Sequence, residues 1–381
     1  MQASLYIHFP FCVRKCLYCD FNSVGGDAMA PRDYVSLLLK EMELRRSRLP
    51  AEVTAPTLYL GGGTPSLMAP DLVREIVDAA RRLFGVEEDA EITMEGNPGT
   101  VSLETLRGYR SAGVNRLSLG VQSFDDRFLA VLGRVHSARE AADAIEAARE
   151  AGFRNLSIDL MHSLPGQSLE EWHDTLRRAL SFAPEHISAY ALIVEPGTPF
   201  EGMDERGELP LPDEEEGARM FESTGEILAA AGYLQYEISN FARPGYQSRH
   251  NTVYWRRGSY LGFGAGAHSF LNRGGTGTRW SNARGIAEYG DAVASGRLPE
   301  EEMHELTVRE AISEGFFLGL RRLDGVDLAE LSAIFRAEDL QPFLAQAESL
   351  VASGALQREG SRVRLAPAAV AVANSVFCRF L

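Results

Sequence analysis

The sequence predicts an α/β fold built on a parallel sheet, and two observations support this prediction. Short β-like runs alternate with helical patterns along the first half of the chain, at residues 5–9, 57–60, 91–95, 116–120, 155–160 and 186–192. Ala-Gly pairs at 112–113, 151–152 and 231–232 each end a helical pattern, and glycine suits the left-handed C′ position there. Strands separated by helices require parallel pairing with right-handed crossovers, so the fold is either an open doubly wound sheet or a barrel.

The helices of this half follow from hydrophobic periodicity. Residues 33–48 place Tyr34, Leu38 and Met42 on one face and charged residues opposite. Ser137 and Glu140 form a capping box, which fixes the start of another helix. The other helices predicted here are residues 71–84, 102–112, a segment from 125, and 168–182.

Polar residues at strand ends weakly favour the barrel over the open sheet. Glu95, Gln122 and Asp159 lie at or just beyond the carboxyl ends of predicted strands. Parallel barrels carry their chemistry on that face, so these side chains are candidate site residues.

A cluster of cysteines follows the first strand. Cys12, Cys16 and Cys19 have the spacing Cys-x3-Cys-x2-Cys, and the remaining cysteine, Cys378, lies near the other end of the chain. Disulfides fit poorly because three is an odd number, and a structural zinc site would need a second pair of ligands that does not follow. An iron–sulfur cluster is the best interpretation, and three thiolates would leave one iron of a cubane open to a small molecule.

This cysteine spacing, with the aromatic Tyr18 before the last cysteine, resembles the signature of the radical S-adenosylmethionine (SAM) superfamily. The resemblance implies a partial (β/α)6 barrel with the cluster at its top. It also implies that the amino and carboxylate groups of SAM bind the open iron, where an electron from the cluster cleaves the sulfonium to a 5′-deoxyadenosyl radical.

Composition restricts the class of protein. The chain has 381 residues, 45% of them hydrophobic and 24% charged, which suffices for one large domain and one or two smaller ones. The net charge of −15 argues against a nucleic-acid surface. No signal peptide or membrane-spanning apolar run is visible, and few cysteines indicate a reducing cytoplasm, so we expect a cytoplasmic protein.

The second half of the chain differs in composition and in its pattern of predicted elements. Residues 204–216 form a charged, proline-bearing connector, and residues 241–280 are an irregular stretch rich in glycine and aromatics, where binding is the default expectation. Helical patterns at 307–320, 328–335 and 340–353 and β-like runs at 356–358 and 362–365 suggest a small winged-helix-like α+β domain that acts as a lid or docking unit. The expected domains are a barrel at 1–200, a connector and mixed binding region at 201–302, and this domain at 303–381.

Several motifs together resemble the family of anaerobic coproporphyrinogen III oxidase and its HemW-type relatives. The match covers most of residues 5–270 and runs through residues 6–12, 61–65, 95–98, 120–124, Arg134 and 159–166. The resemblance implies that SAM contacts Tyr6, Tyr18, Gly62, Gly63, Thr64, Glu95, Gln122, Arg134 and Asp159. The acids would bind ribose hydroxyls and the amino group, and Arg134 the carboxylate.

Each of these residues also has a structural interpretation. The glycines at 61–63 could form a plain tight turn, and Glu95 could cap the segment that follows it. Gln122 could be a polar strand end, and Arg134 could pair with a surface acid.

Two departures separate the chain from the oxidase. Phe21 stands where the oxidase pattern has a fourth cysteine, and only four residues precede Leu5, whereas the oxidase has a longer segment that helps enclose the porphyrinogen. The chain instead resembles the HemW branch, which is described as haem chaperones.

A second signature of that branch is His250, Asn251, Tyr254 and Trp255, which the resemblance makes the haem-binding segment. Imidazole is a common axial ligand of haem iron, and flat aromatics suit a macrocycle face. His268 is a rival ligand, and without the family match a hydrogen-bonded loop histidine beside core aromatics would be the simpler interpretation. We expect Cys378 to be a small buried hydrophobe.

The resulting prediction is a haem chaperone that carries a [4Fe-4S] cluster and SAM. Its partners would be haem and haem-accepting proteins, with peripheral contact with membrane-bound acceptors and a homodimer as open possibilities, and no nucleic acid. The alternative is an oxygen-independent coproporphyrinogen III oxidase, which decarboxylates its substrate oxidatively.

Overall fold

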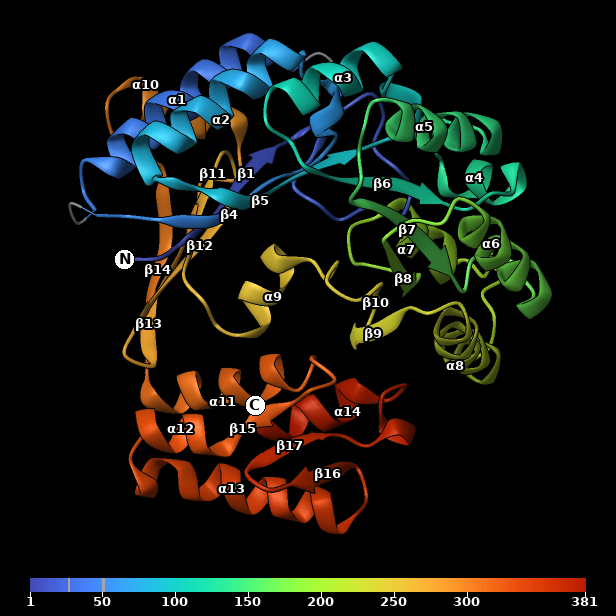
Figure 1. The fold of residues 1–381 in the computed structure, drawn as a ribbon, viewed down its shortest axis with the longest axis vertical. Helices are drawn as coiled ribbons and strands as arrows, with labels where there is room; N and C mark the ends of the chain where they lie inside the picture. The colour runs from blue at the N-terminus through green and yellow to red at the C-terminus, as the bar shows by residue number, and fades with distance from the viewer. Residues whose placement is uncertain (27, 50–51) are drawn as a thin grey trace.

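The computed structural model describes residues 1–26, 28–49 and 52–381 and is built around six adjacent parallel strands (Figure 1). Along the sheet their order is β1, β4, β5, β6, β7, β8, which is the order of the chain. This confirms the predicted partial barrel over the open doubly wound sheet. The strands are β1 (Ser4–Phe9), β4 (Ala55–Gly62), β5 (Val86–Gly96), β6 (Arg116–Gln122), β7 (Leu156–His162) and β8 (His186–Ala191).

Helices cover the outer face of these strands, and each helix predicted in this half is present (Figure 1). The capping box is confirmed, since Ser137 Oγ accepts from Glu140 N and the Glu140 side chain accepts from Ser137 N. The helices are α1 (Pro31–Arg46), α2 (Pro70–Phe84), α3 (Leu103–Ser111), α4 (Asp126–Leu132), α5 (Ala138–Glu150), α6 (Leu169–Ser181) and α8 (Glu214–Ala230). A further short helix, α7 (Pro199–Glu205), instead packs against the cysteine loop, where Phe200 N donates to Leu17 O.

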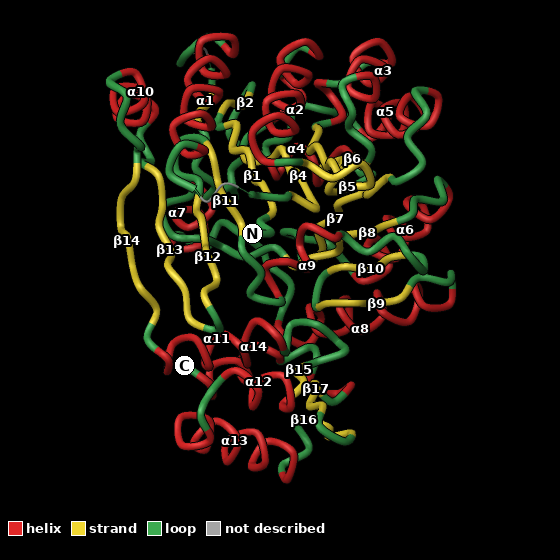
Figure 2. Tube along the Cα trace, turned by 60° about the vertical axis from the view of Figure 1, so that its left-hand side comes forward, coloured by secondary structure: helices red, strands yellow, loops and turns green. Residues whose placement is uncertain are grey.

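The sheet continues past the barrel strands on both sides. Beside β8 lie β10 (Asn240–Ala242) and β9 (Leu234–Glu237), both antiparallel to their neighbours. Beside β1 lies β11 (Tyr260–Phe263), in parallel, followed by antiparallel strands that form the long wall seen in Figure 2. Those strands are β12 (His268–Arg273), β13 (Thr276–Asn282) and β14 (Glu300–Leu306).

The prediction that residues 241–280 are irregular is therefore wrong. The segment holds α9 (Arg249–Trp255) as well as strands β11, β12 and β13. Its glycines misled the prediction because close strand approach requires them: a Cβ at Gly262 would lie 2.1 Å from the carbonyl oxygen of His268.

Residues beyond β14 form a second hydrophobic core below the barrel (Figure 2). Three helices pack with a small three-stranded antiparallel sheet, whose first strand follows the first helix and whose other two strands follow the third helix, which confirms the winged-helix-like arrangement. The elements are α11 (Val308–Gly319), β15 (Val326–Asp327), α12 (Leu328–Ile334), α13 (Ala337–Ala352), β16 (Leu356–Glu359), β17 (Arg362–Leu365) and α14 (Ala373–Phe377).

Cys378 corrects one prediction, because it is exposed rather than buried. It starts a final 3-10 turn, Cys378–Phe380, in which the flanking Phe377 and Phe380 fill the C-terminal core and leave Cys378 facing outward.

A buried ion cluster joins the C-terminal helices to the barrel wall. Glu314 of α11 accepts from Arg257 at 3.0 Å and pairs with Arg279 of β13 at 2.9 Å. Arg257 and Glu314 are each about 8% exposed at the side chain, so the pair is largely screened from solvent.

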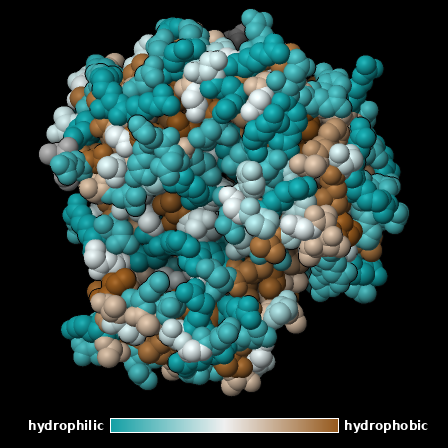
Figure 3. Space-filling view, viewed as in Figure 1, coloured by the Kyte–Doolittle hydropathy of each residue, from teal (hydrophilic) through white to brown (hydrophobic). Residues whose placement is uncertain are grey.

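No helix among residues 1–26, 28–49 and 52–381 is both long and apolar enough to cross a bilayer. Most of the face in Figure 3 is hydrophilic, with apolar side chains gathered near the junction between the barrel and the C-terminal residues.

A buried carboxylate holds α1 against the sheet extension. Glu41 accepts from Gly264 N at 2.8 Å, from Asn282 Nδ2 at 2.7 Å and from the Tyr289 hydroxyl at 2.8 Å. Burial raises the pKa of Glu41 to about 7, although these hydrogen bonds and Arg45 act in the opposite direction. Because the folded state binds this proton more tightly than the unfolded chain does, folding is favoured at low pH, and that contribution is lost as pH rises through 7.

Glu41→Gln should flatten this pH dependence. We expect the free energy of unfolding of the parent to fall by roughly 3 kcal/mol more than that of the variant between about pH 5 and pH 8. Urea unfolding at several pH values measures both profiles, with Glu43→Gln, an exposed change on the same helix, as the control. Parallel profiles for parent and Glu41→Gln would contradict the assignment.

Candidate functional site

The cysteine loop is held over the mouth of the barrel. Short strands β2 (Phe11–Cys12) and β3 (Val24–Gly25) pair at its base, and Val24 N donates to Pro10 O at 2.8 Å. Its middle rests on the end of α4, since Leu17 N donates to Leu132 O at 3.1 Å and Arg14 donates to Gly133 O at 2.8 Å. This anchoring places the three thiols of the loop over the barrel interior.

Those thiols, Cys12, Cys16 and Cys19, form no disulfide bonds and line one cavity of about 470 Å³. Within the part of the chain that the structure describes, no three His, Cys, Asp or Glu side chains meet at the spacing of a single-ion site. Eight of the nine residues predicted to contact SAM line the same cavity: Tyr18, Gly62, Gly63, Thr64, Glu95, Gln122, Arg134 and Asp159. The ninth, Tyr6, lies outside this lining.

The glycine turn after β4 packs directly against the cysteine loop. Gly63 N donates to Phe9 O at 2.7 Å, and Thr64 N donates to Phe11 O at 2.8 Å. The Thr64 hydroxyl also lies 3.4 Å from Cys12 Sγ. A Cβ at Gly63 would lie 2.7 Å from Phe11 O and 3.0 Å from Cys12 Sγ, so this contact requires glycine.

Two carboxylates line the cavity from β5 and β7, the strands on either side of β6. Glu95 accepts from the Tyr59 hydroxyl at 2.8 Å and from Gly62 N at 3.2 Å, and burial raises its pKa to about 7. Asp159 accepts from three serine hydroxyls at 2.7 to 3.1 Å, and burial raises its pKa as well. Both carboxylates therefore keep fixed orientations at the cavity wall.

Arg134 and Gln122 are fixed by neighbours in the cavity wall. Arg134 lies 3.4 Å from Cys16 Sγ, donates to Gly120 O at 2.6 Å and also donates to Asn97. Gln122 has a φ of 67° and accepts from the Tyr190 hydroxyl at 2.8 Å. Arg134 is thus paired inside the barrel rather than with a surface acid.

Arg116 is a cavity residue that sequence reasoning missed. It begins β6, is only 2% exposed, and its Nε has no hydrogen-bond partner among the described residues. Its positive charge favours the ionised forms of Glu95 and Asp159 and so opposes the effect of burial on their pKa values. The period-2 alternation of Arg116 and Ser118 along the strand was a usable signal, because alternate residues face the barrel interior.

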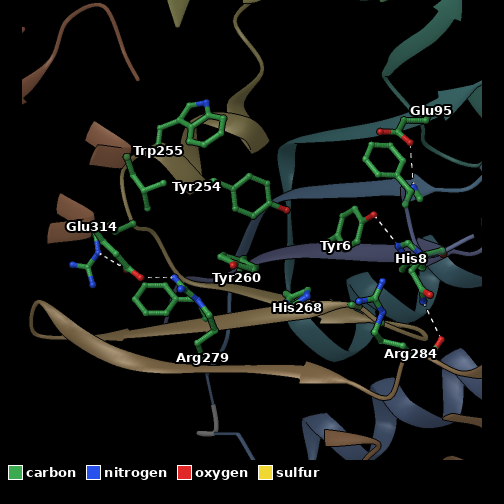
Figure 4. A pocket seen from close by; sticks show the side chains of 18 residues that line it. Tyr6, His8, Glu95, Tyr254, Trp255, Tyr260, His268, Arg279, Arg284 and Glu314 are labelled. Atoms are coloured by element: carbon green, nitrogen blue, oxygen red, sulfur yellow. Dashed lines mark hydrogen bonds and ion pairs between the residues drawn. The ribbon is translucent and has the colours of Figure 1, made fainter. Parts of the chain in front are cut away.

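A second cavity of about 540 Å³ adjoins the first and shares Phe21, Gly62 and Glu95 with it. Figure 4 shows aromatic side chains from α9 and β11 across from the β12 and β13 wall. Glu314 and Leu318 of α11 close one end. The aromatic residues of the lining are Tyr6, Phe21, Tyr254, Trp255, Tyr260 and Phe270.

The structure separates the four residues of the predicted haem-binding segment. Tyr254 and Trp255 line the second cavity, whereas Asn251 lines the cysteine cavity. His250 lines neither cavity, is 1% exposed, and has both ring nitrogens within hydrogen-bond distance of partners, Thr57 Oγ1 at 2.7 Å and the Tyr254 hydroxyl at 2.8 Å. The rival candidate, His268, lines the second cavity.

A partial parallel barrel with a three-cysteine loop at its mouth defines a radical SAM protein. Residues 6–179 match the Radical SAM superfamily model, and residues 306–372 match the HemN C-terminal domain model. The superfamily implies a [4Fe-4S] cluster and SAM, and the residues of the cysteine cavity fit both, with three free thiols, two acids and the unpaired Arg116 Nε.

More specific relatives are heme chaperones. Heme chaperone HemW of Bacillus subtilis (strain 168) is 38% identical over 379 residues, covering 99% of each chain. Heme chaperone HemW of Escherichia coli (strain K12) is 46% identical over 268 residues, covering 70% of this chain and 69% of that one. The chain therefore belongs to the HemW family. The solved structure of coproporphyrinogen III oxidase (HemN) from Escherichia coli has a TM-score of 0.85, 23% identity and coverage of 99% and 89%, which shows a shared fold.

Proposed function

We propose that this protein is a haem chaperone that binds haem in the second cavity and transfers it to haem-accepting proteins. The observation that carries the proposal is an aromatic cavity of about 540 Å³ that adjoins the cysteine cavity. Pockets of this size, apolar with a few polar groups, suit a flat cofactor-sized ligand. The names of the HemW relatives support the same function.

The walls of the cavity suit a metalloporphyrin. Tyr254 and Trp255 on α9 and Tyr260 and Phe270 on the sheet offer flat surfaces for the macrocycle. Arg279 and Arg284 supply positive charge for carboxylates in a chain whose net charge is −15. In this proposal His250 acts indirectly, because its hydrogen bond fixes the Tyr254 hydroxyl.

The cysteine cavity would hold the resident cofactors. Cys12, Cys16 and Cys19 would bind the cluster, which supplies one-electron chemistry when present. Glu95 and Asp159 would orient the hydroxyl and ammonium groups of SAM, since their fixed carboxylates face the cavity. Arg134 would hold the Cys16 side of the loop in place.

An anaerobic haem titration of the cluster-loaded protein tests this proposal. We expect near-stoichiometric binding, seen as a change in the haem Soret absorbance, and subsequent loss of that haem to an added apo-globin. Tyr254→Leu should weaken binding by about tenfold, because it removes a wall of the cavity. Tyr246→Leu, a partly exposed change outside the cavity, is the matched control. A parent protein that leaves the haem spectrum unchanged would refute the proposal.

A second candidate, oxidation of coproporphyrinogen III, is favoured by one observation. The two cavities share Phe21, Gly62 and Glu95, so a macrocycle in one would lie next to SAM in the other. Phe21 argues against the oxidase activity, because the oxidase pattern has a fourth cysteine at this position. Anaerobic incubation with coproporphyrinogen III should give no product with the parent or with Phe21→Cys, and product from either protein would move the assignment to the oxidase.

A further inference from the structure

His268 differs from every other histidine of the chain. Of the eight histidines, seven have at least one ring nitrogen within hydrogen-bond distance of a partner: His8, His136, His162, His173, His186, His250 and His304. For the His268 ring, the described residues provide neither a hydrogen bond nor an ion pair. Its side chain is exposed and lines the second cavity.

The backbone beneath His268 is fixed although its ring is unbonded. His268 begins β12 and pairs with Ser281 of β13. Gly266 N donates to Ala283 O at 2.9 Å, and Asn282 N donates to Ala267 O at 2.9 Å. In Figure 4 the His268 ring lies on the sheet wall of the cavity, and Tyr254 lies on the opposite side. The residue therefore presents a free imidazole from a rigid strand.

The imidazole of His268 is chemically suited to bind iron. Partial burial and, next, the neighbouring Arg279 lower the pKa of His268, while Glu302 opposes them and Arg284 adds a smaller lowering. A neutral imidazole has the lone pair that iron requires, and no described residue hydrogen-bonds to the His268 ring.

Arg284 supplies a cation beside this ring. It lies two residues beyond β13, is exposed and lines the same cavity (Figure 4). Arg257 and Arg279 are both paired with Glu314, whereas the guanidinium of Arg284 has no hydrogen-bond or ion-pair partner in the described chain. Its backbone is held by Asn22, whose Nδ2 donates to Arg284 O at 3.0 Å.

We propose that His268 provides the axial nitrogen ligand to haem iron and that Arg284 pairs with a haem propionate. The proposal rests on the proposed haem-binding function and names the residues that would carry it. A guanidinium and a carboxylate form a charge-assisted pair, and the cavity aromatics would cover the macrocycle between the two anchors.

His250 is a poorer ligand in this structure for a physical reason. Ligation by its ring would require breaking at least one hydrogen bond, to Thr57 or to the Tyr254 hydroxyl, and opening a fully buried site. Leaving a buried polar group without a partner is unfavourable. His268 incurs no such cost.

Titration with ferric haem and with metal-free protoporphyrin IX separates ligation from packing. His268→Ala should raise the Kd for haem at least tenfold and leave that for protoporphyrin unchanged, and added imidazole should restore the Soret position. His250→Ala should affect both ligands equally, through Tyr254. A His268→Ala protein with the haem affinity and Soret position of the parent would overturn the ligand assignment.

A second titration tests the carboxylate anchor. Arg284→Gln should weaken haem binding about tenfold and have no effect on binding of the haem dimethyl ester, which lacks free carboxylates. Arg297→Gln, an exposed change nearby, should match the parent with both ligands. Equal loss with haem and ester would overturn the role of Arg284. Failure of the parent to bind any of these ligands would instead refute the proposed function.

Discussion

Replacing Cys16 with serine should leave a folded protein that retains almost no cluster. The parent, reconstituted without oxygen, should hold about four irons per chain and show broad visible absorbance. Serine replaces a soft thiolate by a hydroxyl that stays protonated, so one iron loses its ligand. Cys16 Sγ lies 3.4 Å from the Arg134 guanidinium, which helps to hold this side of the loop in place. Iron analysis and absorbance measure the loss, and circular dichroism shows whether the chain still folds.

Cys378→Ser is the matched control for that change. Cys378 is exposed, lies in the last turn of the chain and is absent from the lining of the cysteine cavity. Its replacement should leave iron content and absorbance at the level of the parent. A full four-iron spectrum in Cys16→Ser, or equal loss in both variants, would contradict the assignment of the three ligands.

The features predicted correctly from the sequence are local ones. The cysteine spacing lies within eight residues, and Glu95 and Gln122 lie at the carboxyl ends of β5 and β6 as predicted, whereas Asp159 lies within β7. Parallel strands in chain order bring such strand ends together whatever the packing details are. Once the barrel forms, the shared cavity of these residues follows from topology alone.

What the sequence did not reveal depends on long-range packing. Arg116 begins a strand whose sequence shows no unusual pattern, and only the folded partial barrel shows that its side chain is buried in the same cavity as Glu95 and Asp159. Likewise, the motif that begins at His250 suggested a haem ligand, whereas in the fold the His250 ring points into the barrel and lies within hydrogen-bond distance of Thr57. The second cavity needs α9, the extended sheet and α11 together, which no single motif encodes.

Gly63→Ala should reduce cluster binding almost as much as Cys16→Ser does, although it replaces none of the three cysteines. The added Cβ would lie within 3.0 Å of Phe11 O and Cys12 Sγ, and within 2.9 Å of the Pro10 carbonyl carbon. These are backbone atoms and the sulfur of a proposed cluster ligand, so the cysteine loop must shift, at a cost of about 1–3 kcal/mol. We expect bound iron to fall by at least half and SAM affinity by about tenfold, measured by iron analysis and equilibrium dialysis.

The effect at Gly63 would be steric, because its φ is not in the left-handed region. Gly225 on α8 provides the comparison, since the nearest atom to its added Cβ is 4.0 Å away. Gly225→Ala should leave iron and SAM binding unchanged and stabilise the helix by about 1 kcal/mol. If Gly63→Ala bound iron and SAM as the parent does, contact between the glycine turn and the cysteine loop would not be what positions the ligands. If Gly63→Ala loses iron and SAM binding and Gly225→Ala does not, the contact between the glycine turn and the cysteine loop positions the site together with the three thiols.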